Sequence, residues 1–270
     1  MKIFKALIVY NLINLVDSFG FKFHTFLGNT LDTQFELYNK TLYLNILKDL
    51  NGSSFANVST WADRIKTNRK YSWTRELHYI DIEECGQVKN PVKYCEKGCI
   101  LKSLDYLSHH NYANLSTFEN WALLLHLSQD LFQPLHSCGF FRGGNDKQFV
   151  LKRRSLNTKG RKINFHQLFD SFLPEYFLKL HLPYNYDSTV NLNITEILQM
   201  NVNLCCKMDW DKNELYLEDF YNSMDGSNYY NTLLNNYLKL SISLFSVKFN
   251  EQSKNSVKFI EQSKNQQCWQ

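Results

Sequence analysis

Residues 120–136, NWALLLHLSQDLFQPLH, constrain the fold more than any other stretch of this sequence. Leucines surround His126 and Asp130, and a helix that is apolar on all sides belongs in a protein core. His126 and Asp130 are four residues apart, so they lie on one side of that helix, one turn from each other. Pro134 ends the helix, and His136 follows in the turn. These buried polar groups need partners, because burial without a partner is costly.

A second pair with the same spacing lies in NFHQLFD, where His166 precedes Asp170 by four residues. Neutral imidazole and carboxylate oxygen are ligands of first-row metals, and zinc is the usual choice. A single pair of this kind is more often a hydrogen bond on a helix surface or in a core. Two such pairs together with His136 indicate that imidazoles and carboxylates converge on divalent metal.

The rest of the sequence predicts one all-α domain over about 19–245. A chain of 270 residues is long enough for a single large core. Its 30 basic and 26 acidic residues are too nearly balanced to indicate nucleic-acid binding by charge alone. Helical apolar spacing occurs over 19–39, 42–50, 100–106, 171–182, 193–207 and 226–244, and a further helix begins near Thr60. We found no convincing run of alternating strands.

Both ends of the chain differ from this domain. Residues 1–18 have a basic start, an apolar middle, and Val16 and Ser18 at the −3 and −1 positions, which predicts a secretory signal peptide. The mature chain would begin at Phe19, without a membrane span, as a secreted or lumenal monomer; the alternative is an uncleaved helix or anchor. SVKFNEQSKN and SVKFIEQSKN repeat over 246–265, and this polar composition predicts a disordered or frayed tail over 246–270.

Cysteine use agrees with an oxidising compartment. The seven cysteines are Cys85, Cys95, Cys99, Cys138, Cys205, Cys206 and Cys268. Cys95 and Cys99 are close enough for a small disulfide loop, and Cys85 could pair with Cys205 or Cys206. An odd number leaves one thiol unpaired. A zinc–thiolate site is the weaker reading, because no CxxC pair occurs twice. Glycosylation sequons lie at Asn39, Asn51, Asn57, Asn114 and Asn193.

The order of the candidate ligands resembles that of a known enzyme family. The segments FGFKFH, WADRIK, LHYID, HLSQDLFQPLH, GGND and NFHQLFD, followed by GSNYYNTLLNNYLKL, are similar to the motifs of the trinuclear-zinc, single-strand-specific nucleases of the mung-bean type (S1/P1 nucleases). The resemblance covers about 19–245 and implies the compact, disulfide-tied helical fold that this family shares with zinc-dependent phospholipase C.

The resemblance implies three zinc ions. The first would be held by Asp63, His78, His126 and Asp130. The second would be held by the amine and carbonyl of Phe19, His24 and the bridging Asp130. The third would be held by His136, His166 and Asp170. The alternative is that these five histidines are separate, satisfied core residues. The other three, His109, His110 and His181, are interpreted as helix-end or surface residues.

The implied activity is hydrolysis of phosphodiester bonds in single-stranded DNA and RNA to 5′-phosphate products, with 3′-nucleotidase activity. Water activated by zinc would attack phosphorus. Asp63 would orient that water, and Lys66 would support the transition state where the family usually has arginine, supplying the charge without the bidentate geometry. Tyr79 would stack a nucleobase, or else pack in the core. Asp81 would contact the base, or else cap local backbone.

Four aromatic substitutions depart from the family pattern. They are Phe19 and Phe169 for tryptophan, Phe23 for glycine and Phe132 for histidine. All primary ligands remain, so we expect a working metal site with altered packing around it. Two alternatives stay open: a zinc-dependent phospholipase C, and a non-catalytic secreted glycoprotein with a structural zinc site. GGND, WADRIK and Tyr79 favour a nuclease over the first, and the intact ligand set argues against the second.

Overall fold

The buried helix expected around His126 lies at the centre of the molecule. The computed structural model describes residues 20–96, 98–154, 156–180 and 193–267. Helix α6 runs from Thr117 to Asp130, and its residues from Asn120 onward are all buried. The Ser116 hydroxyl accepts from the Glu119 N–H, and the Glu119 carboxylate accepts from the Ser116 N–H. This capping box explains why the helix begins where it does.

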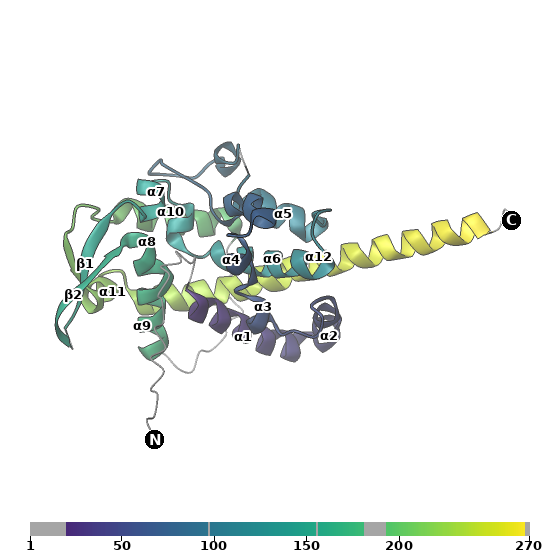
Figure 1. Ribbon diagram of the computed structural model, residues 1–270, viewed down its shortest axis with the longest axis horizontal. Helices are drawn as coiled ribbons and strands as arrows, with labels where there is room; N and C mark the ends of the chain where they lie inside the picture. The colour runs from purple at the N-terminus through teal and green to yellow at the C-terminus, as the bar shows by residue number, and fades with distance from the viewer. Residues whose placement is uncertain (1–19, 97, 155, 181–192, 268–270) are drawn as a thin grey trace, which may run out of the picture.

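Other helices pack around α6 (Figure 1). Those that precede it are α1 (Phe21–Tyr38), α2 (Lys40–Asp49), α3 (Phe55–Val58), α4 (Trp61–Ile65), the 3-10 helices η1 (Arg69–His78) and η2 (Pro91–Tyr94), and α5 (Ile100–His109). Those that follow are η3 (Pro134–Ser137), α7 (Phe141–Gly144), α8 (Phe165–Gln167), the π-helix η4 (Leu168–Phe172), α9 (Leu173–Leu180), α10 (Ile194–Lys207), α11 (Leu217–Ser223) and α12 (Gly226–Gln267). The predicted helical, disulfide-tied domain is confirmed.

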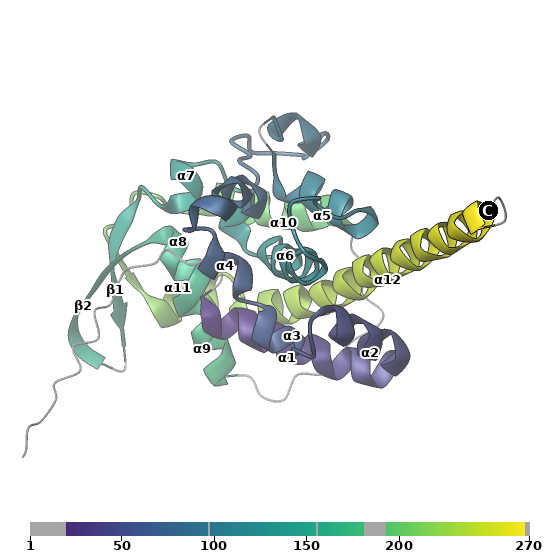
Figure 2. The ribbon, with the colours of Figure 1, turned by 45° about the vertical axis from the view of Figure 1, so that its right-hand side comes forward.

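A small sheet, which the sequence analysis missed, lies at one end of the helical body (Figure 2). Its strands are β1 (Gln148–Arg153), β2 (Leu156–Asn164) and β3 (Glu214–Tyr216), in the order β2-β1-β3. β1 pairs antiparallel with β2, with Phe149 opposite Ile163, and parallel with β3. Its apolar residues are few: Phe149, Val150 and Leu151 are consecutive in β1, and Leu156 and Ile163 lie near the two ends of β2. The strand signal is therefore short and weak.

The last helix is longer than the sequence predicted. α12 continues past Leu244 to Gln267, so residues 246–267, which were expected to form a disordered or frayed tail, are helical in the structure. Lys248 is only 1% exposed, and its ammonium donates to the carbonyls of Leu107 and His110 and to Asn111 Oδ1. These bonds satisfy carbonyls at the end of α5 and attach the first repeat copy to the body. The signal peptide and the domain boundaries remain predictions, and residues 1–18 lie outside the described part.

Three disulfides tie the helices together. Cys95 bonds to Cys99, as the spacing indicated, and Cys85 bonds to Cys206. A third bond joins Cys138 to Cys205 and was not anticipated. These pairings exclude a zinc–thiolate site among the six cysteines concerned. The seventh, Cys268, lies outside the described residues. Because Cys205 and Cys206 are adjacent, α10 anchors both the segment after His78 and the turn after His136.

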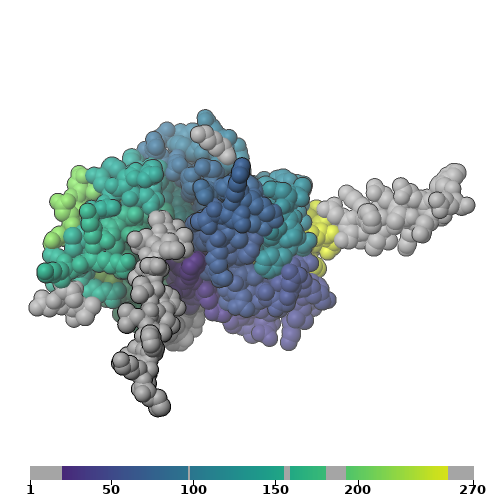
Figure 3. Space-filling view, viewed as in Figure 1, coloured from purple at the N-terminus to yellow at the C-terminus, as the bar shows by residue number. Residues whose placement is uncertain are grey.

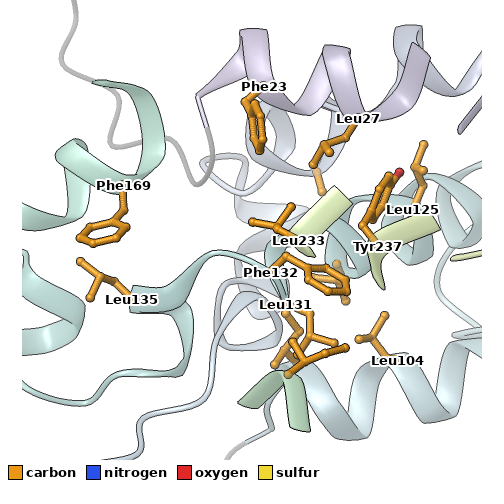
Figure 4. Close-up of a cluster of buried hydrophobic side chains, with 14 of the residues drawn as sticks. Phe23, Leu27, Leu104, Leu125, Leu131, Phe132, Leu135, Phe169, Leu233 and Tyr237 are labelled. Carbon is orange, nitrogen blue, oxygen red and sulfur yellow. The ribbon is translucent and has the colours of Figure 1, made fainter. Parts of the chain in front are cut away.

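Three of the four aromatic substitutions noted in the sequence pack in the core (Figure 4), and the fourth, Phe19, lies outside the described residues. Phe132 makes an edge contact with Tyr237 at 6.1 Å between ring centroids, and Phe23 makes one with Tyr230 at 5.8 Å. Phe169 contacts Phe220 at 6.0 Å. Such pairs stabilise beyond the area that they bury.

Among the described residues, none of the helices combines the length and apolar character needed to cross a bilayer.

Replacement of Lys248 by methionine tests whether the first repeat copy belongs to the folded body. The substitution removes the ammonium that donates to the carbonyls of Leu107 and His110, and we expect the free energy of unfolding to fall by about 1–3 kcal/mol. Lys254→Met, on an exposed part of the same helix, should change it by less than about 0.5 kcal/mol. Urea unfolding measures both. Equal, small effects would show that the repeat is not packed as described.

Candidate metal centre

Asp130, at the end of α6, is surrounded by four imidazoles. Its carboxylate lies 2.7 Å from His78 Nδ1, 3.1 Å from His126 Nε2, 3.4 Å from His24 Nε2 and 3.7 Å from His136 Nδ1. All five side chains are buried. They come from η1, α6, α1 and η3, segments far apart in the sequence. The structure therefore brings together the residues that the motif order had indicated.

A second buried carboxylate, Asp63, lies on α4 beside the first. Its oxygens are 3.5 Å from His126 Nε2 and 3.8 Å from His24 Nε2. Lys66, one turn later, places its ammonium 2.7 Å from Asp63 Oδ1. Asp63 thus links the buried histidines to the partly exposed ammonium of Lys66.

A third group is built by the segment that follows β2. The Asn164 side chain caps α8 in a capping box with Gln167, and η4 continues the helix with a π turn. This geometry leaves His166 Nε2 3.5 Å from Asp170 Oδ2. The His136 ring stacks on the His166 ring at 5.3 Å between centroids. π turns are frequent at functional sites.

These residues form three groups with the chemistry of metal sites. They are His24, His126 and Asp130; Asp63, His78 and His126; and His136, His166 and Asp170. Within each group the nitrogen and oxygen atoms that could bind a metal lie within 4.8 Å of one another. His78 Nε2 and Asp170 Oδ2 are buried and have no hydrogen-bond partner among the described residues. A cation bound at each of the two groups would satisfy the atom that belongs to that group, so the donor set fits zinc.

Hydrogen bonds fix the orientation of the imidazoles. His126 Nδ1 lies 2.6 Å from the Ser59 carbonyl, and His166 Nδ1 lies 2.7 Å from the Gly143 carbonyl. A carbonyl can only accept, so each Nδ1 carries a proton and each Nε2 faces the centre. Gln133 donates to Asp170 Oδ1 at 2.7 Å. Sequence reasoning missed these supporting residues, because only the folded chain brings them near the ligands.

Burial and charge set the protonation of the centre. Burial lowers the pKa of His136 to about 3 and that of His166 to about 4, so both are neutral, the form that binds metal. Burial would also lower the pKa of His126, but Asp130 and Asp63 outweigh it and raise that pKa to about 10. The pKa of Asp170 is raised by burial. A metal cation near His126 would take the place of its proton.

The centre opens into a cleft of about 650 Å³. Its lining residues are Lys66, Thr67, Arg75, His78, Tyr79, Asp81, Leu135, His136, Arg142, Gly143, Asn145, Asn164 and His166. The two predicted substrate-binding residues, Tyr79 and Asp81, are both on its wall. The Tyr79 hydroxyl donates to Glu76 at 2.7 Å, which holds the ring in place. Burial, with Glu76 and Glu83 nearby, raises the pKa of Asp81.

Several polar residues of the cleft were given no role in the sequence analysis, among them Arg75, Arg142 and Asn145. Arg142 and Gly143 have φ values of 53° and 62°, and a Cβ at Gly143 would lie 2.7 Å from the Leu135 carbonyl. The glycines of GGND therefore allow the close turn that presents Arg142 and Asn145, and the motif itself was a usable signal. Arg75 had no such signal.

One predicted ligand, Phe19, and the three histidines that were expected at helix ends or on the surface are not part of the described centre. Phe19 and His181 lie outside the described residues. Gly20, next to Phe19, donates its N–H to the Asp170 carbonyl at 2.5 Å. His109 and His110 lie at the end of α5, where His109 bonds to its own helix through the Asp105 carbonyl.

Comparisons with known proteins agree with this geometry. The sequence model of the S1/P1 nuclease family matches residues 23–253. Nuclease P1 of Penicillium citrinum is 28% identical over 145 residues, which are 50% of this chain and 51% of that protein. Nuclease S1 of Aspergillus oryzae is 27% identical over 143 residues, 48% of this chain and 46% of its own. Endonuclease 4 of Arabidopsis thaliana is 26% identical over 220 residues, which are 73% of this chain and 68% of that protein.

The matched region spans about half the length of the two fungal nucleases. The family match, in contrast, extends from α1 into α12 and includes every described residue of the three metal-binding groups. This protein belongs to the S1/P1 nuclease family.

Proposed function

We propose that this protein is a zinc-dependent nuclease that cleaves single-stranded DNA and RNA to 5′-phosphate products and also has 3′-nucleotidase activity. Family membership supports a hydrolase that acts on nucleic acid. The observation that carries the finer proposal is that two of the three buried His/Asp groups reach one open cleft, through His78, His136 and His166, and that the remaining group shares His126 with one of them. Lysine and arginine on the cleft wall suit a phosphodiester substrate.

The chain offers ligands for three zinc ions, assigned as the family resemblance implies. The first would be held by Asp63, His78, His126 and Asp130; the second by the amine and carbonyl of Phe19, with His24 and Asp130; the third by His136, His166 and Asp170. Bound zinc supplies a Lewis acid toward phosphate oxygen and lowers the pKa of water. The protein holds the ligands rigidly through Ser59, Gly143 and the two glutamines Gln129 and Gln133.

Asp63 and Lys66 act together at the cleft floor. Burial acts to raise the pKa of Asp63, but the charges of His126 and Lys66 outweigh it and lower that pKa, so Asp63 stays ionised. Burial acts to lower the pKa of Lys66, yet Asp63 raises it, so Lys66 stays protonated. Lys66 is therefore a fixed positive charge where phosphate enters, and Asp63 is a carboxylate positioned to orient water.

Tyr79 and Asp81 support selectivity for single strands. The Tyr79 ring is fixed by its bond to Glu76, and aromatic rings stack nucleobases with little regard to base identity. A base can reach such a ring only when it is unstacked, as in a single strand. Asp81 lies close enough along the cleft wall to accept a hydrogen bond from a base edge.

The three disulfides support a location in the secretory pathway. The predicted signal peptide agrees with that location. In the assignment taken from the family resemblance, its removal would also complete the metal centre, because it frees the amine of Phe19 as a ligand of the second zinc. A free amine at Phe19 can bind metal, whereas an amide nitrogen cannot do so without losing its proton.

A substrate comparison tests the proposed activity. Mature protein loaded with zinc should release 5′-nucleotides from single-stranded DNA and RNA, act on 3′-AMP, and cleave duplex DNA far more slowly. A chelator should abolish these activities and added zinc should restore them. Hydrolysis of phosphatidylcholine in place of nucleic acid would identify a phospholipase C, and absence of all these activities with zinc bound would indicate a structural site.

Retention of residues 1–18 tests the role of the amino terminus. The unprocessed chain should hold fewer zinc ions tightly than the processed chain and cleave single strands poorly, because Phe19 then has no basic amine. Elemental analysis after dialysis gives the zinc content of both forms. Three tightly held ions in the unprocessed chain would contradict this role.

Lys66→Met tests the cationic role of this residue. We expect kcat to fall about 100-fold, the order of magnitude for loss of one group that stabilises developing charge. Lys66→Arg should retain more activity, because it keeps the charge. Zinc content should be unchanged in both variants, and Lys70→Met, an exposed lysine of η1, serves as the control. A kcat for Lys66→Met near the wild-type value would remove Lys66 from the mechanism.

A further inference from the structure

The basic residues of this chain are concentrated in one place. Seven of its 30 lysines and arginines lie between residues 147 and 162, a segment with no aspartate or glutamate. They are Lys147, Lys152, Arg153, Arg154, Lys159, Arg161 and Lys162. The rest of the chain has 23 basic and 26 acidic residues, so the whole positive excess of the protein arises from the β1–β2 hairpin.

The acidic neighbours of the hairpin neutralise only one side of it. Asp211, Glu214 and Asp219, in and around β3 and α11, pair with Lys147, Lys152 and Arg154, respectively. The other four cations have no carboxylate within ion-pair distance in the part of the chain that the structure describes. They are Arg153, Lys159, Arg161 and Lys162. Three of these four lie on β2, the outer strand of the sheet.

The cations without a carboxylate partner begin next to the cleft. Asn164, the last residue of β2, lines the cleft beside the metal centre. Lys162 lies two residues before it, on the same face of the strand and about 7 Å away. The cations of β2 extend as far as Lys159, five residues and about 17 Å before Asn164. The hairpin forms the end of the molecule, on its open left side in the space-filling view (Figure 3).

The cleft wall continues the same charge. Arg142 and Asn145, just before β1, line the cleft, as do Lys66 and Arg75 on its other side. Arg161 lies over the Phe172 ring at 5.4 Å, which holds its guanidinium at the base of the hairpin. A cationic path therefore leads from the metal centre along the outer edge of β2.

We propose that this outer edge of the β1–β2 hairpin binds the phosphate backbone of a single-stranded nucleic acid whose scissile bond lies in the cleft. The proposal rests on the proposed function and adds a binding surface beyond the site of cleavage. Lysine and arginine bind backbone phosphates without regard to sequence, with release of counterions. A dinucleotide is too short to reach from the cleft to the end of β2, so the contribution of the hairpin depends on substrate length.

A competing explanation is that the cations only protect an edge strand. Lysines on an edge discourage pairing with other chains. This explanation places no demand on substrate length or on salt. Binding of a strand predicts that long substrates are favoured over short ones, and that this preference decreases as salt increases.

The test uses the mature, zinc-loaded protein with two double variants. Lys159→Gln/Lys162→Gln removes two exposed charges of β2, and Lys40→Gln/Lys48→Gln removes two exposed charges of α2, at the opposite end of the body. The value of kcat/KM is measured on a 20-nucleotide single strand and on a dinucleotide at several salt concentrations. Thermal unfolding checks that each variant is folded.

We expect the β2 variant to lose about tenfold in kcat/KM on the 20-nucleotide strand at low salt and to change little on the dinucleotide. For the β2 variant, the slope of log kcat/KM against log salt should be shallower by about 1.4, the value for two lost phosphate contacts on a single strand. The α2 variant should match the wild type on both substrates.

Other outcomes would overturn the proposal. Equal losses on both substrates would mean that the hairpin acts through the shape of the centre. No loss on either would leave edge protection as its role. If the β2 variant lost binding to phosphatidylserine vesicles but kept the wild-type preference for long substrates, the hairpin would be a membrane contact. Failure of the proposed function is distinguishable, because the wild type would then cleave neither substrate, and the proposal would fall with it.

Discussion

The burial of Asp130 among four histidines is the interaction on which the rest of the structure depends. A carboxylate without access to water needs positive charge or hydrogen-bond donors close by. His24, His78, His126 and His136 surround it from four separate segments, and although burial acts to raise the pKa of Asp130, the charge of His126 outweighs burial and lowers that pKa. The chain can satisfy Asp130 only by packing α1, η1, α6 and η3 against one another, so the electrostatic requirement of the centre and the helical core are formed together.

The surroundings of the centre show which parts of the family pattern can vary. The positions now held by Phe23, Phe132 and Phe169 pack against aromatic rings of the core, where shape and area matter more than any one residue type. Gln133 differs from them, because it donates to a ligand carboxylate. We expect such orienting residues to tolerate less change than the aromatic ones, since misplaced ligands weaken metal binding.

The parts of the fold that could be predicted are those that depend on local spacing. α6 and its pair His126 and Asp130 follow from apolar residues at helical intervals, and the other ligands follow from the order of motifs. The burial of Lys248 and the Cys138–Cys205 bond could not be predicted, because both join residues far apart in sequence. The β1–β2 hairpin was missed because its apolar residues are few and basic residues lie between them.

The most direct test of this account is X-ray diffraction from crystals of the mature protein, collected on either side of the zinc absorption edge. The account predicts three anomalous peaks in one cluster: one between His24 and Asp130, one between Asp63 and His78, and one beside His166 and Asp170. Peaks away from these residues, or an ordered centre without zinc in protein that cleaves single strands, would contradict it.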